Sequence, residues 1–165
     1  MEDFVKIYTG YLKTVYRFLL KLSGNPDIAE ELTQATFVAA FEHLDQFQGR
    51  CKMSVWLCQI AKHEYFVYYR NNKCFTGQEV PVDYQHPVDV EADVIKKDEQ
   101  RRILGTLLKI PEPYQEVFTL HVIGDVSYQD ISQLFGKSES WARVTYYRAK
   151  KMILERLGGE MDDIM

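Results

Sequence analysis

The stretch from Ser127 to Arg156 constrains the fold of this chain most, because it contains two helix starts separated by one tight turn. Ser127 precedes an apolar stripe, and a serine there can cap a first turn that also holds Asp130. Gly136 stands where helices commonly end in the left-handed conformation, and Ser138 can cap a second helix. Two helices joined so closely must cross at a steep angle. The pattern predicts a helix-turn-helix, which is a DNA-reading unit.

The second helix of this unit has a packing face and a basic face. Steps of three and four place Ala142, Tyr146, Ala149 and Ile153 on the side that packs, and Ser140, Arg143, Tyr147, Lys150 and Lys151 on the other. Between positions 137 and 156, six Lys and Arg residues outnumber two Glu, in a chain of net charge -4. A solvated charged face is the alternative interpretation. The two capped helices favour DNA binding instead.

Composition is that of a globular chain, with 46% hydrophobic and 27% charged residues. There is no run of about 18 apolar residues, and the N-terminus lacks the basic and then apolar order of a signal peptide, so we expect a cytoplasmic protein. Cys51, Cys58 and Cys74 match no paired zinc pattern. We interpret them as reduced thiols and expect no metal and no cofactor. A redox or metal role would need a further ligand such as His63.

Charge is unevenly distributed along the chain. Positions 27–45 hold five acidic residues and no basic one, whereas positions 50–73 hold five basic residues and one Glu. Positions 79–99 hold seven acidic residues and two Lys. Basic blocks separated by an acidic connector are compatible with nucleic-acid binding, even where the whole chain is acidic.

Helical periodicity extends over most of the chain. It predicts helices over about 2–22, 26–47, 53–70, 94–108 and 114–123, with the helix-turn-helix after them. The periodicity is lost between positions 71 and 91. The sequence therefore predicts an all-α fold of two small helical domains joined by a flexible linker. The domains are expected at 1–74 and at 98–158, the second containing the helix-turn-helix, with an acidic linker at 75–97 and a tail at 159–165.

The segment KHEYFVYYRNNK, at positions 62–73, alternates aromatic and basic side chains. Exposed aromatic rings beside basic groups suit single-stranded DNA, because every base offers a face for stacking and every phosphate a charge. The alternative is that the rings belong to a core. Tyr65, Phe66, Tyr68 and Tyr69 cover most of the circumference of one helix, so at least one or two of them should be exposed.

Three segments together carry a family resemblance. They are AEELTQATFVAAF at positions 29–41, SVWLCQIAKHEYFVYYRNNK at 54–73 and IPEPYQEVFTLHVIGDVSYQDISQLFGKS at 110–138. In this order they resemble the polymerase-binding helix, the promoter-melting helix and the entry to the second DNA-binding domain of one family. The chain thus resembles an RNA polymerase sigma factor of the sigma-70 family, in its extracytoplasmic-function (group IV) subfamily.

The resemblance implies a transcription initiation factor that binds core RNA polymerase and directs it to promoter DNA, with no catalytic residues and no small-molecule substrate. It implies polymerase contacts at Glu31 and Gln34. It implies that the factor melts the -10 element. The residues expected to contact this element are Arg50, Lys52, His63, Tyr65, Phe66, Tyr69, Arg70 and Asn71. The -35 element would be read by Ser140, Arg143, Tyr147, Arg148, Lys150 and Lys151. A separate anti-sigma factor, often membrane-anchored in this family, is a further expected partner.

Other classes of protein explain less of the sequence. A stand-alone helix-turn-helix transcriptional regulator would explain the last thirty residues, but it would give the segments at 29–41 and 54–73 no function. A purely protein-binding helical module, such as an anti-sigma factor, accounts for the acidic net charge alone. An enzyme is least compatible, because the four His residues are scattered and no Gly-rich phosphate loop or nucleophile-base motif occurs. Trp141 and Ala142 depart from the family's usual recognition-helix start, so the promoter sequence does not transfer.

Overall fold

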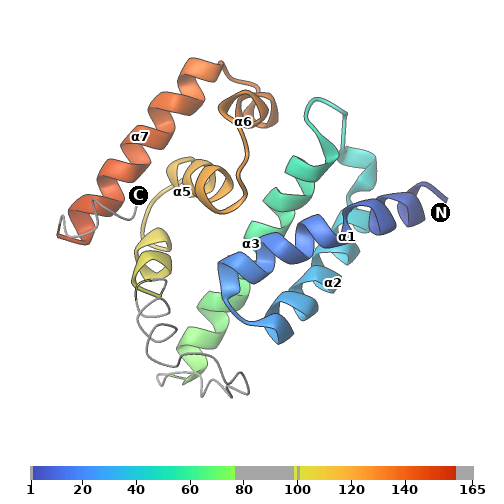
Figure 1. Ribbon diagram of the computed structural model, residues 1–165, viewed down its shortest axis with the longest axis horizontal. Helices are drawn as coiled ribbons and strands as arrows, with labels where there is room; N and C mark the ends of the chain where they lie inside the picture. The colour runs from blue at the N-terminus through green and yellow to red at the C-terminus, as the bar shows by residue number, and fades with distance from the viewer. Residues whose placement is uncertain (1, 77–98, 100, 159–165) are drawn as a thin grey trace.

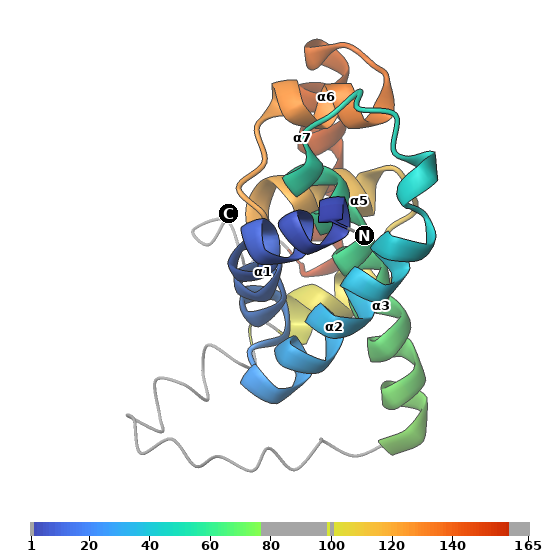
Figure 2. The same cartoon turned by 90° about the vertical axis from the view of Figure 1, so that its right-hand side faces the viewer.

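The computed structural model describes residues 2–76, 99 and 101–158, and every regular element in these ranges is a helix (Figures 1 and 2). We call residues 2–76 the N-terminal half and residues 101–158 the C-terminal half. The N-terminal half consists of α1 (Glu2–Ser23), α2 (Pro26–Glu42), the short 3-10 helix η1 (Leu44–Gln46) and α3 (Met53–Thr76). The predicted tail and positions 77–97 of the predicted linker lie outside the described residues.

The start of α2 agrees with the sequence prediction, but its end does not. The Asn25 side chain accepts hydrogen bonds from the backbone N–H groups of Asp27 at 2.9 Å and Ile28 at 3.3 Å, with proline at the first helical position. The helix ends at Glu42 rather than near Phe47. Phe47 leaves the helix and its ring lies 5.1 Å from that of Trp56 in α3. This tertiary contact replaces the last predicted turn.

α3 is longer than the apolar pattern indicates. Its backbone stays helical to Thr76, past the position where the apolar periodicity is lost. Near its end the Asn72 side chain donates a hydrogen bond to the Tyr68 carbonyl at 2.8 Å. α3 thus extends past the loss of apolar periodicity, because adding residues to a helix that has already started costs little.

The C-terminal half contains the predicted helix-turn-helix. A helical segment at 101–107 precedes α5 (Tyr114–Phe118), the single π-helical turn η2 (Thr119–Ile123), α6 (Tyr128–Phe135) and α7 (Glu139–Arg156). Ser127 Oγ accepts from the Asp130 N–H at 3.1 Å, and Ser138 Oγ accepts from the Trp141 N–H at 3.0 Å. Gly136 between the two helices has a φ of 65°. Both predicted caps and the predicted left-handed turn are confirmed.

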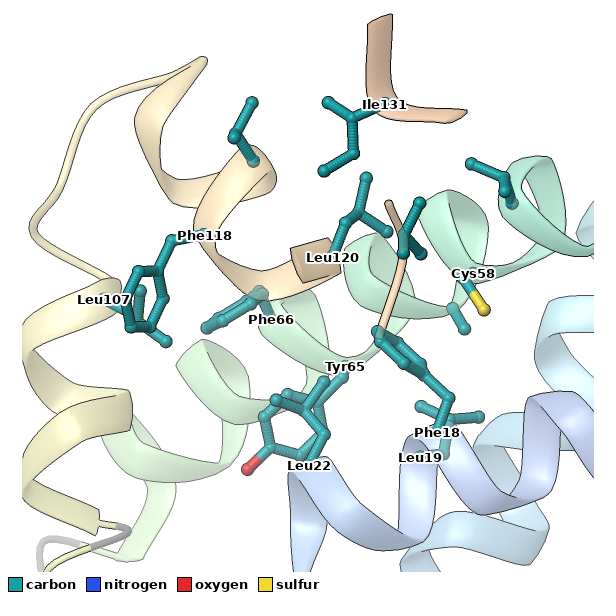
Figure 3. Packing of buried hydrophobic residues seen from close by; sticks show 14 of the residues in the cluster. Phe18, Leu19, Leu22, Cys58, Tyr65, Phe66, Leu107, Phe118, Leu120 and Ile131 are labelled. Atoms are coloured by element: carbon teal, nitrogen blue, oxygen red, sulfur yellow. The ribbon is translucent and has the colours of Figure 1, made fainter. Parts of the chain in front are cut away.

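The two halves pack against each other. α3 contacts α6 and η2, and α1 also contacts η2. Figure 3 shows Phe66 of α3 beside Phe118 and Leu107 of the C-terminal half, with Leu120 on the side of Phe18. The all-α fold with two helical regions is confirmed, and the structure adds that the regions share one hydrophobic core. Within the described ranges no helix is long and apolar enough to cross a membrane.

Candidate nucleic-acid interface

The face of α7 that points away from the core is the better defined of the two candidate DNA surfaces. Ala142, Ala149 and Ile153 are fully buried and Tyr146 is nearly so, which confirms the predicted packing face. The residues proposed to read DNA fall on the other side. Ser140, Arg143, Tyr147, Arg148 and Lys151 are exposed and Lys150 is partly exposed. The structure thus brings the six predicted residues together on one accessible surface.

Arg143 is oriented by neighbouring side chains. Its guanidinium lies over the Tyr128 ring of α6, 5.1 Å from the ring centroid, and 3.4 Å from a Glu139 carboxylate oxygen. An aromatic face attracts a cation and restricts its side-chain rotamers. The Tyr128 ring in turn stacks on His121 with ring centroids 4.3 Å apart, and His121 Nδ1 lies 2.9 Å from the Val126 carbonyl oxygen. Arg143 therefore projects from a layered aromatic support.

This aromatic support is partly removed from water. Burial raises the pKa of the Tyr128 hydroxyl, and the nearby Tyr147 and Tyr146 raise it further against the opposing effect of Arg143. Burial is also the main cause of the raised pKa of Tyr146. Both hydroxyls stay neutral and able to donate hydrogen bonds at physiological pH. They place no negative charge under the arginine.

The second candidate surface lies on α3 and on the loop before it. Arg50, Lys52, His63, Arg70 and Asn71 are exposed and Tyr69 is half-buried. Tyr65 and Phe66 retain only 4% and 1% of their exposure. The expectation that their rings are accessible is wrong for this arrangement. α3 is covered on two sides, by α1 and α2 on one and by the C-terminal half on the other, so all four aromatics are at least half-buried.

The exposed side of α2 carries the residues predicted to bind polymerase. Glu31 and Gln34 are both exposed, and the Gln34 amide donates a hydrogen bond to the Tyr8 hydroxyl at 3.2 Å. Val38 and Phe41 follow at helical spacing and are 58% and 49% exposed. Phe41 is supported by Phe4, at a centroid distance of 4.8 Å. This face of α2 thus combines a carboxylate with two accessible apolar side chains.

Sequence reasoning missed the role of Lys62. Its side chain is only 8% exposed and its Nζ lies 2.9 Å from a Glu112 carboxylate oxygen of the C-terminal half. Glu116 lies beside this pair, and burial raises the pKa of its carboxyl despite the favourable influence of Lys62 and a hydrogen bond with Gln59. The separation of 50 residues between Lys62 and Glu112 leaves no local signal for the pairing.

The thiols do not form a metal site with other ligands in the described ranges, where no three His, Cys, Asp or Glu residues are grouped to hold an ion. Cys51 and Cys58 are free, and Cys58 is buried. Burial raises the pKa of Cys58 to about 12. The Cys74 side chain lies outside the described part.

Both halves of the chain match models of known protein families. Residues 7–74 match the model of Sigma-70 region 2, and residues 100–153 match that of Sigma-70, region 4. The chain is a sigma factor. It belongs to the extracytoplasmic-function group of the sigma-70 family and is a transcription initiation factor that directs RNA polymerase to promoters. Its family comprises regulatory proteins and not enzymes.

Relatives of this sigma factor cover almost its full length. It is 28% identical to the ECF RNA polymerase sigma factor SigM of Bacillus subtilis, over 90% of this chain and 91% of that protein. It is 26% identical to the RNA polymerase sigma factor YlaC of the same organism, over 87% of this chain and 86% of that protein. The family match therefore extends across both halves and the segment between them.

Two solved structures share the fold of this sigma factor. One is the sigma factor RpoE in complex with the anti-sigma factor NepR from Bartonella quintana, with a TM-score of 0.56 and 21% identity over 97% of this chain and 99% of that one. The other is CnrH in complex with the cytosolic domain of CnrY, with a TM-score of 0.57 and 19% identity over 96% of this chain and 90% of that one.

Proposed function

We propose that this sigma factor divides promoter recognition between its halves, with α7 reading the -35 element and α3 with its preceding loop holding the -10 element. The observation that carries the proposal is the set of exposed polar side chains on α7, presented by a capped helix-turn-helix. A recognition helix of this kind enters the major groove and reads base edges. Arg143 and Ser140 would contact bases, and Lys150 and Lys151 would contact phosphates.

On α3, the exposed His63, Arg70 and Asn71 and the loop residues Arg50 and Lys52 would contact the unpaired -10 strand. Stacking on an aromatic side chain contributes about 1–3 kcal/mol per base, which offsets the cost of unpairing. Half-buried Tyr69 is the ring available for this contact. Phe66 would join it only after the C-terminal half moves away, and Tyr65, which lies toward Leu22 of α1 in Figure 3, stays in the core.

α2 would bind core RNA polymerase. Glu31 and Gln34 supply polar contacts, and Val38 with Phe41 supplies an apolar contact on the same face. Acidic residues without basic ones between positions 27 and 45 favour a basic partner surface. The residue ranges that we propose for the domains are 1–74 and 98–158, with the linker at 75–97 and the tail at 159–165.

The remaining partners follow from the family. One of the two solved structures with this fold is a sigma factor in complex with an anti-sigma factor, and we propose a separate anti-sigma factor, anchored in the membrane, as a partner of this chain. The protein would act in the cytoplasm with RNA polymerase, without catalytic activity of its own, without a cofactor and without a small-molecule substrate.

The test is permanganate footprinting of promoter DNA with core polymerase and the purified chain. We expect reactive, unpaired thymines in the -10 region that depend on both proteins, and their loss with Glu31→Lys. A Glu155→Lys variant makes the same charge change on α7 and should still bind core polymerase. A stand-alone helix-turn-helix regulator would instead protect duplex DNA without polymerase and open no bases.

A further inference from the structure

The outward side of α1 carries a basic stripe that the proposed promoter and polymerase contacts do not include. Its members are all exposed, and they are Lys6, Lys13, Arg17 and Lys21. At 3.6 residues per turn, these four positions fall within an arc of about 80° around the helix. The opposite side packs on α2 and α3, and its buried residues include Val15 and Leu22 (Figures 1 and 2). The α1 stripe therefore faces away from the core.

The charge of the α1 stripe is of one sign. Positions 4–26 hold four Lys and Arg residues and no Asp or Glu, in a chain of net charge -4. Lys21 Nζ lies 3.5 Å from Asp125 Oδ2. Among the residues that the structure describes, no carboxylate forms an ion pair with Lys6, Lys13 or Arg17. These three cations thus have no counter-charge in the described part of the chain.

The arrangement is unfavourable for the helix itself. Lys13 and Arg17 are like charges four residues apart, as are Arg17 and Lys21, and such pairs destabilise a helix. Gly10 lies in the middle of the stripe, where glycine is less favourable than alanine. Its φ is not positive, and a Cβ there would meet no other described part of the molecule within 4 Å, so neither backbone nor packing requires glycine. Residues that lower helix stability without serving the fold are expected at functional surfaces.

The α1 stripe has the chemistry and the length of a phosphate-binding surface. A missing side chain lets another backbone approach a helix closely, and at Gly10 this approach is flanked by cations. The interval from Lys6 to Lys21 spans about 22 Å, which equals the axial rise of about six base pairs of duplex DNA. Lys and Arg side chains bind such a backbone by neutralising its phosphates and releasing counterions.

Duplex DNA fits the α1 stripe better than a lipid surface does. α1 packs on α3, which carries the proposed -10 contacts, and it also contacts η2. Lys21 pairs with Asp125, two residues before the Ser127 cap of the helix-turn-helix. α1 therefore adjoins both proposed DNA surfaces. An anionic membrane is a poorer partner, because the apolar side of α1 is buried in the core and cannot insert.

We propose that the α1 stripe binds the phosphate backbone of duplex DNA between the -35 and -10 elements. Lys6, Lys13 and Arg17 contact phosphates, and Gly10 is the point of closest approach. The contact adds affinity without sequence preference, because phosphates carry no base identity. Its place between the two elements rests on the proposed division of promoter recognition. The phosphate contact itself rests on the charge of α1 and on Gly10.

The first test measures the salt dependence of promoter binding by the chain in complex with core polymerase. Fluorescence anisotropy of a labelled promoter duplex compares the unmodified chain with Lys13→Gln/Arg17→Gln. Each lost phosphate contact lowers the slope of log Kobs against log salt by about 0.9, so we expect the slope to fall by about 2. From about 50 mM to about 200 mM salt, the unmodified chain should then lose about tenfold more affinity for DNA than the variant.

The matched control is Arg102→Gln/Lys109→Gln, which removes two exposed cations from segment 101–109. Its slope should equal that of the unmodified chain, and circular dichroism checks that both variants retain their helix content. Selection from a randomised promoter pool should return the same sequences with Lys13→Gln/Arg17→Gln as with the unmodified chain. Equal slopes in all three proteins would overturn the proposal, and so would a changed selected sequence.

The second test addresses the close approach at Gly10. Gly10→Gln places a neutral side chain in the middle of the stripe, and glutamine is the better helix former. Urea denaturation should therefore show no loss of stability, while promoter binding weakens severalfold for all sequences alike. Promoter affinity equal to that of the unmodified chain would show that no backbone approaches Gly10 closely.

The third test identifies the partner directly. A photoreactive benzophenone amino acid at Thr14, which is exposed one turn from Arg17, should crosslink to the duplex between the two promoter elements. Crosslinks to a polymerase subunit and not to DNA would overturn the proposal and make the stripe a protein-binding surface. Failure of the proposed function is read separately, as no directed initiation by the unmodified chain. Failure of the present proposal leaves directed initiation intact.

Discussion

At the scale of single residues, the proposed -35 contact depends on how Arg143 is held. The guanidinium rests on Tyr128 and lies near Glu139, so its direction is set before DNA arrives. A side chain that is oriented in advance loses less conformational entropy on binding. Arg143 is therefore the residue on α7 whose loss should alter sequence preference most.

Arg143→Ala should relax the base preference at the -35 element, because a bidentate arginine contact with guanine contributes about 1–3 kcal/mol of discrimination. Lys151→Ala is the matched control, since it removes one charge from the same helix. It should weaken binding to all -35 sequences alike and lower the salt dependence of DNA binding. Selection of -35 sequences from a randomised promoter pool measures both effects. An unchanged selected sequence with Arg143→Ala would refute this assignment.

Cysteine reactivity should differ between the described thiols. Cys58 is buried and burial raises its pKa to about 12, so it holds almost no thiolate at neutral pH. Cys51 is partly exposed. Its pKa is raised mainly by burial and also by the Asp130 carboxylate, and the shift is smaller than that of Cys58. Alkylation followed by peptide mass mapping should modify Cys51 well before Cys58, and Asp130→Asn should speed reaction of Cys51. Equal rates in the native chain would contradict the described burial of Cys58.

The residues of α7 could be predicted from the sequence because their periodicity is local, and all six lie on the accessible side. Tyr65 and Phe66 could not be placed in this way. An aromatic and basic helix looks the same in the sequence whether a second domain covers it or not. The partner that buries Phe66 lies beyond position 100, so no window of α3 reports it.

At the scale of elements, the helix-turn-helix is held by its caps. Ser127 and Ser138 each satisfy an N–H group at a helix start, and Gly136 adopts the left-handed conformation that turns the chain. These features could be predicted because capping chemistry involves neighbours three residues apart. The ends of α2 and α3 could not be predicted. α2 ends before Phe47, whose ring packs on Trp56, and α3 continues to Thr76 without an apolar stripe.

Ser138→Ala should lower the free energy of unfolding by about 1 kcal/mol, because the Trp141 N–H loses its acceptor at the start of α7. Ser138→Asp keeps an acceptor and adds a favourable charge at the helix N-terminus, so its stability should stay close to that of the unmodified chain. Urea denaturation followed by circular dichroism gives the comparison. If alanine and aspartate behave alike, Ser138 does not cap α7.

At the scale of the whole molecule, the decisive feature is that two family regions meet through charge and apolar contacts. The pair of Lys21 and Asp125 joins positions 104 residues apart, and that of Lys62 and Glu112 joins positions 50 apart. The sequence showed the opposite charge of neighbouring blocks but not which side chains face each other. The close contact of the halves is a finding of the structure alone.

Glu116 should make stability depend on pH. Burial raises the pKa of its carboxyl above the usual 4.5, so the folded state binds this proton more tightly than the unfolded chain does. The contribution is complete below about pH 4.5 and is lost as the pH rises through the raised pKa. Glu116→Gln should flatten the fall in the free energy of unfolding as the pH rises above about 4.5, measured by urea denaturation. If the free energy of unfolding falls with pH just as steeply in Glu116→Gln, the pH dependence arises from another group.

The most direct test of the account is transcription in vitro with purified core RNA polymerase and a library of promoter fragments. The account predicts that adding the chain converts nonspecific initiation into initiation at defined positions downstream of a shared pair of sequence elements. It also predicts that Glu31→Lys abolishes this effect, while Arg143→Ala changes which upstream element is used. Transcripts that start at the same positions with and without the chain would contradict the account.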